Sequence, residues 1–525
     1  MSEREQQILD FLLQPSYRPL DRAAVIRRLK LDAAEHEEFH AALDGLIDSK
    51  RVRENRKGLL RPRISGGTIA GIVRRTRAGD GYFVAHETQP ALRGQDAYLS
   101  KSDIRDAHSG DEVLVRLSSR TRADGKRCAR VEEILVRASN KFVGTYLEQG
   151  GQGFVLVDGR TFTEPIAVGD PGARGAIPSD KVVIEMLRFP MLNLPGEAVL
   201  TEVLGQRGAP GVDTQSVIHQ FGLPHEYPEE ALAYARQQAD AFDEEDLGDR
   251  LDLTGETIIT IDPVDARDFD DAISLKRTPD GHWHLGVHIA DVAHFVTPDS
   301  PLDREALRRG TSVYLPRHVI PMLPELISNG LASLQQGRVR YTKSAFIEYD
   351  PEGIPLATDF ARSAIKVTRR FAYEQVMPLL AGQEPSGPKV TKPVRELLAN
   401  MHELAMLLRR RRFEGGALEL NLKEVELEFD THGHVTGAHE TEHDESHQII
   451  EEFMLAANIA VATRLDDLGI PFLRRVHGEP DLLKLEAFAK FAEALGYPLT
   501  RWQSRQDLQQ AIRQVEGQPE ERALN

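Results

Sequence analysis

Five aspartates within ten residues, from Asp262 to Asp271, constrain this chain more than any other feature. Apolar runs rich in β-branched residues flank them at 257–261 and 272–275, and both runs predict strands that enter a core. Carboxylates this close to apolar strands repel one another unless a cation lies among them. Hard divalent cations take oxygen ligands, and Mg²⁺ often combines carboxylates with substrate phosphates. The cluster therefore predicts a metal site for phosphate chemistry.

The acidic run has two alternative interpretations. An acidic surface loop is the plain alternative, since most charge runs are simply solvated. A calcium loop of the EF-hand type is disfavoured because no glycine stands between Asp262 and Leu275.

The length of 525 residues predicts several domains, roughly three or four. A single cysteine, Cys128, excludes an internal disulfide and a cysteine-based zinc site, and it fits a reducing compartment. No apolar run reaches the ~18 residues of a membrane span, and the N-terminus lacks the apolar core of a signal peptide. We expect a soluble, cytoplasmic protein that is a monomer without an obligate protein partner.

Charge is segregated along the chain although the net charge is −17. Residues 50–77 hold ten Lys and Arg against one acid, and residues 116–130 hold six against one. Residues 226–252 hold ten acids and two arginines. A basic N-terminal third followed by an acidic connector indicates that only some surfaces of the chain meet phosphate.

The first 63 residues predict a winged helix-turn-helix. Apolar positions recur at helical spacing in 5–13, 20–29 and 33–47, and the basic stretch 51–60 predicts a hairpin that forms the wing. Such a module binds nucleic acid or mediates other contacts.

A weak duplication follows and predicts two successive small β-barrels, at 64–138 and 139–207. Segments 67–71, 81–84 and 110–115 recur in order as 143–146, 153–156 and 179–184, with glycine-rich turns between short strands. Aromatic side chains on such barrels stack on single-stranded bases. The candidates are Tyr82, Phe83, Tyr98 and Phe154, although each ring could instead fill its barrel.

Residues 208–525 predict one large α+β domain. Strand-like runs at 285–292 and 344–349 alternate with helical patterns at 394–412, 447–468 and 480–495.

Seven segments of this region together resemble the ribonuclease II family, and more closely its ribonuclease R branch. They are, in order, 210–213 (PGVD), 260–272 (TIDPVDARDFDDA), 287–292 (VHIADV), 310–316 (GTSVYLP), 320–325 (IPMLPE), 326–334 (LISNGLASL) and 447–458 (HQIIEEFMLAAN). The resemblance implies a multidomain fold with a winged helix-turn-helix, two OB-like barrels of the cold-shock type and a mixed α+β RNB catalytic domain.

The resemblance also implies a processive 3′-to-5′ exoribonuclease that hydrolyses single-stranded RNA to nucleoside 5′-monophosphates with Mg²⁺, or alternatively Mn²⁺. The aspartates that match the family's catalytic and metal-binding acids are Asp262, Asp268, Asp270 and Asp271, whereas Asp265 stands outside this set. Tyr314 matches the aromatic that stacks on the terminal nucleotide. Leu420 stands where the family usually has a phenylalanine clamp, which leaves an apolar contact without a stacking face.

Three further residues have the composition of a metal site, His288, Asp291 and His294, but we expect core or supporting roles for them. The family pattern continues into an arginine segment that contacts the scissile phosphate and then into an S1 barrel, and we expect both to be absent here. An RNA-binding protein or regulator with an incomplete nuclease domain is therefore the alternative function. A DNA-binding transcription factor is a distant third.

Overall fold

A computed structural model describes residues 3–12, 20–29, 31, 35–49, 51–54, 58–62, 68–76, 78–85, 96–122, 126–159, 162, 164–191, 194–384, 388–418, 424–441, 443–476 and 478–524. The chain forms two compact units, Met1–Leu223 and Pro224–Asn525, and each is described by itself. None of the helices in these ranges is long and apolar enough to cross a membrane.

The first unit begins with the predicted winged helix-turn-helix. Helices α1 (Glu3–Leu12), α2 (Arg22–Leu29) and α3 (His36–Asp48) precede a hairpin of β1 (Val52–Glu54) and β2 (Leu60–Pro62). One apolar core joins all five elements, because each helix buries a single stripe of its surface: Ile8, Leu12, Val25, Phe39, Leu43, Leu46, Val52 and Leu60. The predicted module is confirmed.

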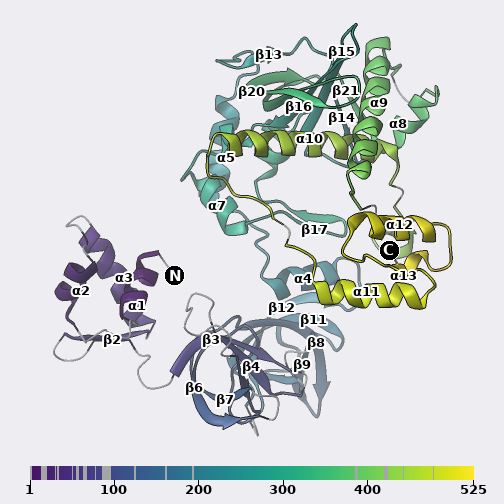
Figure 1. The fold of residues 1–525 in the computed structure, drawn as a ribbon. Helices are drawn as coiled ribbons and strands as arrows, with labels where there is room; N and C mark the ends of the chain where they lie inside the picture. Colours follow the sequence, from purple (N-terminus) through teal and green to yellow (C-terminus); the bar gives the residue numbers. More distant parts are fainter. Residues whose placement is uncertain are drawn as a thin grey trace. The chain divides into compact units, whose positions relative to one another are not determined.

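Two closed barrels of identical strand order follow (Figure 1). The first contains β3 (Thr68–Arg75), β4 (Gly81–Ala85), β5 (Ala97–Leu99), β6 (Glu112–Thr121) and β7 (Arg127–Val136). The second contains β8 (Lys141–Gln149), β9 (Gln152–Val157), β10 (Ile166–Val168), β11 (Asp180–Arg188) and β12 (Glu197–Gln206). In each barrel the first three strands are neighbours in order, and the fifth strand lies between the third and the fourth. The structure therefore confirms the predicted duplication.

Helix α4 (Val212–Phe221) packs against β8, β11 and β12 of the second barrel. We expected the α+β domain to begin near Gly208, whereas the first compact unit extends to Leu223. The reason is that α4 turns its buried side chains, Val212 and Ile218 among them, toward the barrel.

A seven-stranded mixed sheet organises the second unit, in the order β13-β20-β19-β16-β15-β14-β21. In chain order these strands are β13 (Leu251–Leu253), β14 (Ile259–Asp262), β15 (Asp271–Arg277), β16 (Trp283–Ala290), β19 (Val339–Tyr349), β20 (Pro355–Lys366) and β21 (Arg369–Ala372). Two short hairpins stand apart from it: β17 (Val313–Leu315) with β18 (His318–Ile320), and β22 (Val425–Phe429) with β23 (Val435–Glu440).

Helices cover both faces of this sheet (Figure 1). One face buries its apolar side chains against α8 (Tyr373–Leu380), α9 (Lys392–Glu414) and α10 (Glu445–Asp467). The other face packs against α5 (Glu229–Ala241), α6 (Val292–Phe295), α7 (Pro301–Arg309) and the π-helical segment η4 (Leu326–Leu331). Successive residues of a strand point to opposite faces, so the sheet supplies both cores.

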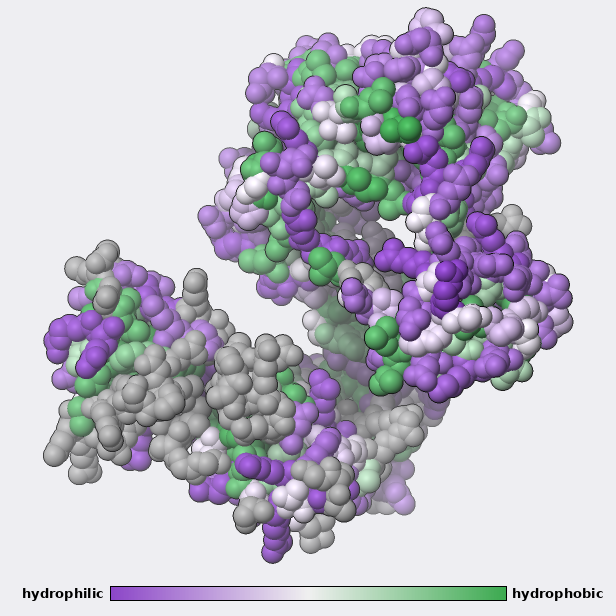
Figure 2. All heavy atoms as spheres, viewed as in Figure 1, coloured by the Kyte–Doolittle hydropathy of each residue, from purple (hydrophilic) through white to green (hydrophobic). Residues whose placement is uncertain are grey.

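The last helices have a small core of their own. Helices α11 (Leu482–Ala494), α12 (Arg505–Val515) and α13 (Glu521–Leu524) meet around Ala492, Val515 and Leu524. Figure 2 shows apolar side chains at several points of the otherwise hydrophilic surface of the second unit, and α10 contributes exposed Ile459 and Val461.

One of the four aromatic side chains proposed to stack on bases lies in a core. Phe83 has an exposed fraction of 0% inside the first barrel, whereas its neighbour Tyr82 is half-buried. The two rings differ because consecutive residues of β4 point to opposite sides of the barrel wall. The prediction that Phe83 stacks on a base is therefore wrong.

This placement predicts that substitutions at two neighbouring residues differ in their effect on the stability of the first barrel. Phe83→Ala should destabilise the first barrel by about 3–5 kcal/mol, because it leaves a cavity in a closed core. Tyr82→Ala should leave its stability nearly unchanged. Hydrogen exchange of peptides from 68–136, followed in low urea, measures both effects, and equal protection in the two variants would contradict the assigned orientation.

Candidate active site

The acidic loop joins two neighbouring strands of the central sheet. Asp262 is the last residue of β14 and Asp271 is the first residue of β15. The two strands are antiparallel, with Ile259 opposite Ile273, and β14 also pairs in parallel with β21, where Asp262 lies opposite Ala372. The two neighbouring strands therefore bring both ends of the acidic loop to the same end of the sheet.

Ser333 fixes the middle of this loop from the segment that follows η4. Its hydroxyl donates to the carbonyl oxygen of Arg267 at 2.7 Å and accepts from the Phe269 N–H at 3.1 Å. The Phe269 carbonyl accepts in turn from the Leu334 N–H, and the Phe269 ring is buried. A buried ring flanked by two held backbone groups sets the positions of Asp268 and Asp270 on either side of it.

Arg370 of β21 anchors the first half of the loop. Its guanidinium donates to the carbonyl oxygens of Pro263 and Val264 at 2.8 and 2.9 Å and lies 4.7 Å from the centre of the Phe269 ring. Its positive charge also lowers the pKa of Asp262, against the larger effects that raise it.

The carboxylates are held where ionisation is unfavourable. Burial raises the pKa of Asp262 to about 7, and the charge of Asp271 adds to the shift. Burial, followed by the charge of Asp270, raises the pKa of Asp271 to about 6. The pKa of Asp270 is raised by desolvation from the surrounding protein and by Asp268, although its side chain opens to solvent. Carboxylates with raised pKa values in close proximity are typical of functional sites.

One oxygen of the acidic loop is suited to a divalent cation. Asp262 is 9% exposed, and its buried Oδ2 has no hydrogen-bond partner in the described part of the chain. An oxygen without a partner among repelling carboxylates is a suitable ligand for a hard cation. Within the described ranges no three or more His, Cys, Asp or Glu side chains are gathered closely enough to hold a metal ion, so the four aspartates are not assembled as a metal site in this structure.

Tyr373 lies next to the strand pair that holds Asp262, and two residues of α10 act on it. Tyr373 follows Ala372 directly, and burial together with the charges of Asp262 and Asp271 raises its pKa to about 12. The ring of His447 stacks on it, with centroids 3.9 Å apart. The charge of Glu451, also from α10, contributes to the raised pKa of Tyr373.

Tyr314 projects from the β17–β18 hairpin with an exposed fraction of 69%. Partial burial, the charges of Asp268 and Asp270 and a hydrogen bond with Asp268 raise its pKa. An exposed aromatic ring whose hydroxyl meets an acid of the loop is available to a nucleotide at that position. Leu420, the other predicted contact, lies outside the described residues.

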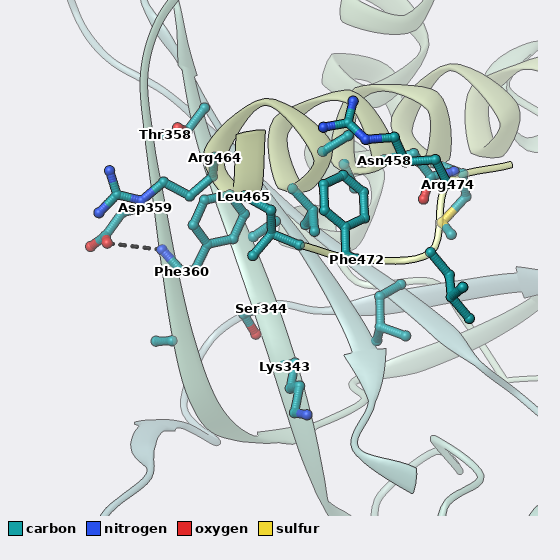
Figure 3. A pocket seen from close by; sticks show the side chains of 18 of the residues that line it. Lys343, Ser344, Thr358, Asp359, Phe360, Asn458, Arg464, Leu465, Phe472 and Arg474 are labelled. Atoms are coloured by element: carbon teal, nitrogen blue, oxygen red, sulfur yellow. Dashed lines mark hydrogen bonds between the residues drawn. The ribbon is translucent and has the colours of Figure 1, made fainter. Parts of the chain in front are cut away.

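A groove opens beside α10 on the sheet face that carries Asp271 (Figure 3). Its volume is about 1270 Å³, between the β19–β20 strands, α10 and residues 472–476. Asp271, Ile289, Lys343 and Arg362 form one cross-strand row, so the acidic loop and the groove share a sheet face. Its lining contains one acid, Asp359, and five cations: Lys343, Arg362, Arg464, Arg474 and Arg475.

His288, Asp291 and His294 have contacts of their own outside the four carboxylates. His288 is buried on the opposite sheet face from Asp271, between the hydroxyls of Ser274 and Ser344, and burial lowers its pKa to about 4. Asp291 forms a buried ion pair with Arg250 at 2.7 Å. His294 packs edge-on against Phe295 and Tyr341. These contacts stabilise the sheet.

In the first unit, Tyr82 and Tyr98 lie opposite each other on β4 and β5, with ring centroids 5.8 Å apart. Lys126 lies 4.4 Å from the Tyr82 ring and Arg122 lies 4.2 Å from the Tyr98 ring. Aromatic faces combined with cations suit bases and phosphates together. Phe154 is half-buried on β9 of the second barrel.

Comparisons with known proteins agree with this architecture. Residues 250–525 match the RNB domain family and residues 154–228 match the cold shock domain family. Ribonuclease R of Thermotoga maritima is 34% identical over 499 residues, which cover 94% of this chain and 69% of that protein. Ribonuclease R of Escherichia coli is 31% identical over 407 residues, which cover 78% of this chain and 50% of that protein.

The structure of Mycoplasma genitalium RNase R in complex with ribose methylated single-stranded RNA has a TM-score of 0.78 and 26% sequence identity, covering 87% of this chain and 71% of that chain. Paired barrels ahead of an acid-lined α+β domain define the RNB-domain class of multidomain proteins. The chain belongs to the RNB family and, within it, to the ribonuclease R branch. It spans between 50% and 69% of the length of the first five ribonuclease R relatives.

Sequence reasoning missed three residues of the site: Arg370, Tyr373 and His447. No spacing rule connects positions more than a hundred residues apart, and each is an ordinary residue type in its own segment. Ser333 and His447 belong to two of the seven family segments, but only the structure shows that Ser333 holds the acidic loop and that His447 stacks on Tyr373.

The raised pKa values predict a pH-dependent stability that Asp262→Asn should change. A carboxyl group whose pKa is raised by folding costs stability once it ionises, so the metal-free second unit should weaken as pH rises from about 4 to about 7. At pH 8 Asp262→Asn should be more stable than the parent by roughly 1–2 kcal/mol, and at pH 4 equal to it. Mg²⁺ should raise the melting temperature of the parent more than that of the variant.

Tryptophan fluorescence measures this unfolding, because Trp283 is buried in the core of the second unit. Asp265→Asn, in the same loop but outside the predicted quartet, is the matched control and should behave as the parent. A parent stability that stays constant between pH 4 and pH 8 would contradict the prediction.

Proposed function

We propose that this protein is a metal-dependent exoribonuclease that shortens single-stranded RNA from its 3′ end and releases nucleoside 5′-monophosphates. The observation that carries the proposal is the acidic loop, in which a buried sheet holds Asp262 and Asp271 at raised pKa values beside Asp268 and Asp270. Membership of the ribonuclease R branch supports the reaction and the polymer.

Asp262, Asp268, Asp270 and Asp271 would hold Mg²⁺, with Mn²⁺ as the alternative. When bound, the metal supplies a Lewis acid for the phosphoryl oxygens and lowers the pKa of a water molecule at neutral pH. The protein's own contribution is to hold the carboxylates in place through Ser333 and Arg370. Tyr314, exposed beside Asp268, would stack on the terminal nucleotide, and Leu420 would provide an apolar contact.

The remaining surfaces suit a long polyanionic substrate. Tyr82 and Tyr98 with their neighbouring cations would bind bases upstream of the reacting end, with Phe154 as the contact on the second barrel. The cationic groove on the sheet face of Asp271 would lower the cost of bringing phosphates to an acidic site. A cytoplasmic location and a monomeric state stay predictions of the sequence.

Incubation with 5′-labelled single-stranded RNA tests the reaction. The parent should produce a ladder of products that shorten from the 3′ end and depend on Mg²⁺ or Mn²⁺. Asp270→Asn should slow the reaction by about 100-fold or more, because one charge-stabilising group is lost. Asp265→Asn should retain the parental rate. The proposal would be overturned if the parent bound RNA without any metal-dependent shortening. It would also be overturned if Asp270→Asn left the rate of shortening unchanged.

The aromatic contacts of the first barrel predict a loss of RNA binding that can be measured separately from catalysis. In an Asp270→Asn background, Tyr82→Ala should weaken the binding of single-stranded RNA by about 1–3 kcal/mol, because one stacking face is lost. Tyr82→Phe keeps the ring and should bind as tightly as the background protein. Fluorescence anisotropy with labelled RNA in EDTA measures both affinities. Equal affinities of the Ala and Phe variants would remove Tyr82 from the RNA-binding surface.

A further inference from the structure

The hairpin that carries Tyr314 has little apolar packing of its own. Among the described strands β17 and β18 pair only with each other, and Ile320 is the one buried residue in them. A two-stranded hairpin is marginally stable by itself in water. The Tyr314 side chain is exposed, so no core holds its ring in place. Contacts at the base of the hairpin must therefore set where this ring lies.

Arg309, the last residue of α7, provides such a contact. It stands shortly before β17 in the chain, and its Nη1 atom donates at 3.2 Å to the carbonyl oxygen of Pro321, which directly follows β18. The Arg309 side chain is 1% exposed. The Met322 N–H donates to the hydroxyl of Ser312 at 2.9 Å and joins the same two ends of the hairpin. The base of the hairpin is thereby closed.

The same guanidinium group ties the hairpin to residues 224–227, the start of the second unit. Nη1 of Arg309 also donates to the carbonyl oxygen of Pro224, and Nη2 donates to that of Glu226, each at 2.6 Å. The guanidinium carbon lies 3.7 Å from the centre of the Tyr227 ring, and the Tyr227 hydroxyl donates to the carbonyl oxygen of Pro321. Only the planar fork of an arginine reaches this many acceptors at once.

The preceding residue, Arg308, shares the counterion of Arg309 without sharing its other contacts. Both side chains donate to Oε1 of the buried Glu305, at 2.6 Å from Arg308 and at 2.7 Å from Arg309. Arg308 is 55% exposed, and in the described part of the chain it makes no hydrogen bond to the hairpin or to residues 224–227. Substitution of Arg308 therefore removes a charge from α7 and leaves the base of the hairpin intact.

We propose that Arg309 is a positioning residue for the terminal nucleotide: by tying the base of the β17–β18 hairpin to residues 224–227, it fixes the place where the Tyr314 ring meets a base. The inference rests on the proposed function for the stacking role of Tyr314 and extends that role to a buried residue that acts through the ring. A displacement of the stacked nucleotide by about 1 Å misplaces the reacting phosphate and can cost about 100-fold in rate.

Hydrogen exchange measured by mass spectrometry tests the anchoring without RNA. Arg309→Ala and Arg309→Lys should both speed exchange in peptides covering 311–322 by about tenfold or more, because a lysine cannot replace the fork. Arg308→Ala should stay within about twofold of the parent, as expected of an exposed side chain. Thermal melting monitors folding. If the Arg309 variants do not fold, Tyr227→Phe tests the same anchor, and loss of its one hydrogen bond should speed exchange by about threefold.

An RNA with 2-aminopurine at its 3′ end tests the placement of the ring, because the fluorescence of this base falls when it stacks on an aromatic side chain. In an Asp270→Asn background with EDTA the RNA stays intact. The background protein should quench the fluorescence, and Tyr314→Leu should abolish the quenching. Arg309→Ala should lose at least about half of it, because the ring is displaced. Arg308→Ala should retain it.

Steady-state kinetics give the consequence for the reaction. Arg309→Ala should lower kcat by about tenfold, since the terminal nucleotide is held less well. KM for a long RNA should stay within about threefold of the parent, because Tyr82 and Tyr98 also contribute to binding in the proposed function. Adding Arg309→Ala to Tyr314→Ala should cause no further loss of kcat.

Different failures lead to different conclusions. Parental exchange at 311–322 in folded Arg309 variants, unchanged quenching in Arg309→Ala, or additive losses of kcat in the double variant would overturn the role of Arg309. Equal effects of Arg308→Ala and Arg309→Ala would also overturn it, and so would a background protein that does not quench. A protein that shows the expected exchange and quenching but never shortens RNA would overturn the proposed function and leave the positioning role standing.

Discussion

The mutual repulsion of aspartates at the end of two buried strands is the constraint on which the second unit depends. Asp262 and Asp271 are fixed by the pairing of β14 and β15, so they cannot separate without disrupting the sheet. Their raised pKa values show that the sheet core opposes their charge. Such a site costs stability until protons or a cation neutralise it, and this links stability, metal binding and the proposed reaction.

Several weak contacts together hold this loop. Ser333 fixes its middle, Arg370 fixes its first half, and Tyr373 follows Ala372, the residue paired with Asp262. These residues come from two parts of the chain, 333 and 370–373, and the contacts of Ser333 and Arg370 are with backbone groups of the loop and the Phe269 ring rather than with the carboxylate oxygens. The acids are thereby positioned while Oδ2 of Asp262 stays available to a ligand.

The first unit carries the surface proposed to bind a flexible polymer. Its duplicated barrels place Tyr82 and Tyr98 on an outer wall beside Lys126 and Arg122, whereas Phe83 fills the interior. Alternation along one short strand decides which ring is available to a base and which ring supports the core.

The sequence alone predicted the modules and an acidic cluster, because hydrophobic periodicity and a dense run of aspartates are local signals that survive without a structure. The choice of four of the five aspartates rests on the family resemblance and stays a prediction. The sequence also indicated the family through seven ordered segments. Only the tertiary structure decided that Phe83 is buried, that α4 packs on the second barrel, that Arg370 holds the acidic loop, and that His447 stacks on Tyr373. Those assignments depend on strand pairing and helix packing between distant residues, and no local pattern records which partners will meet.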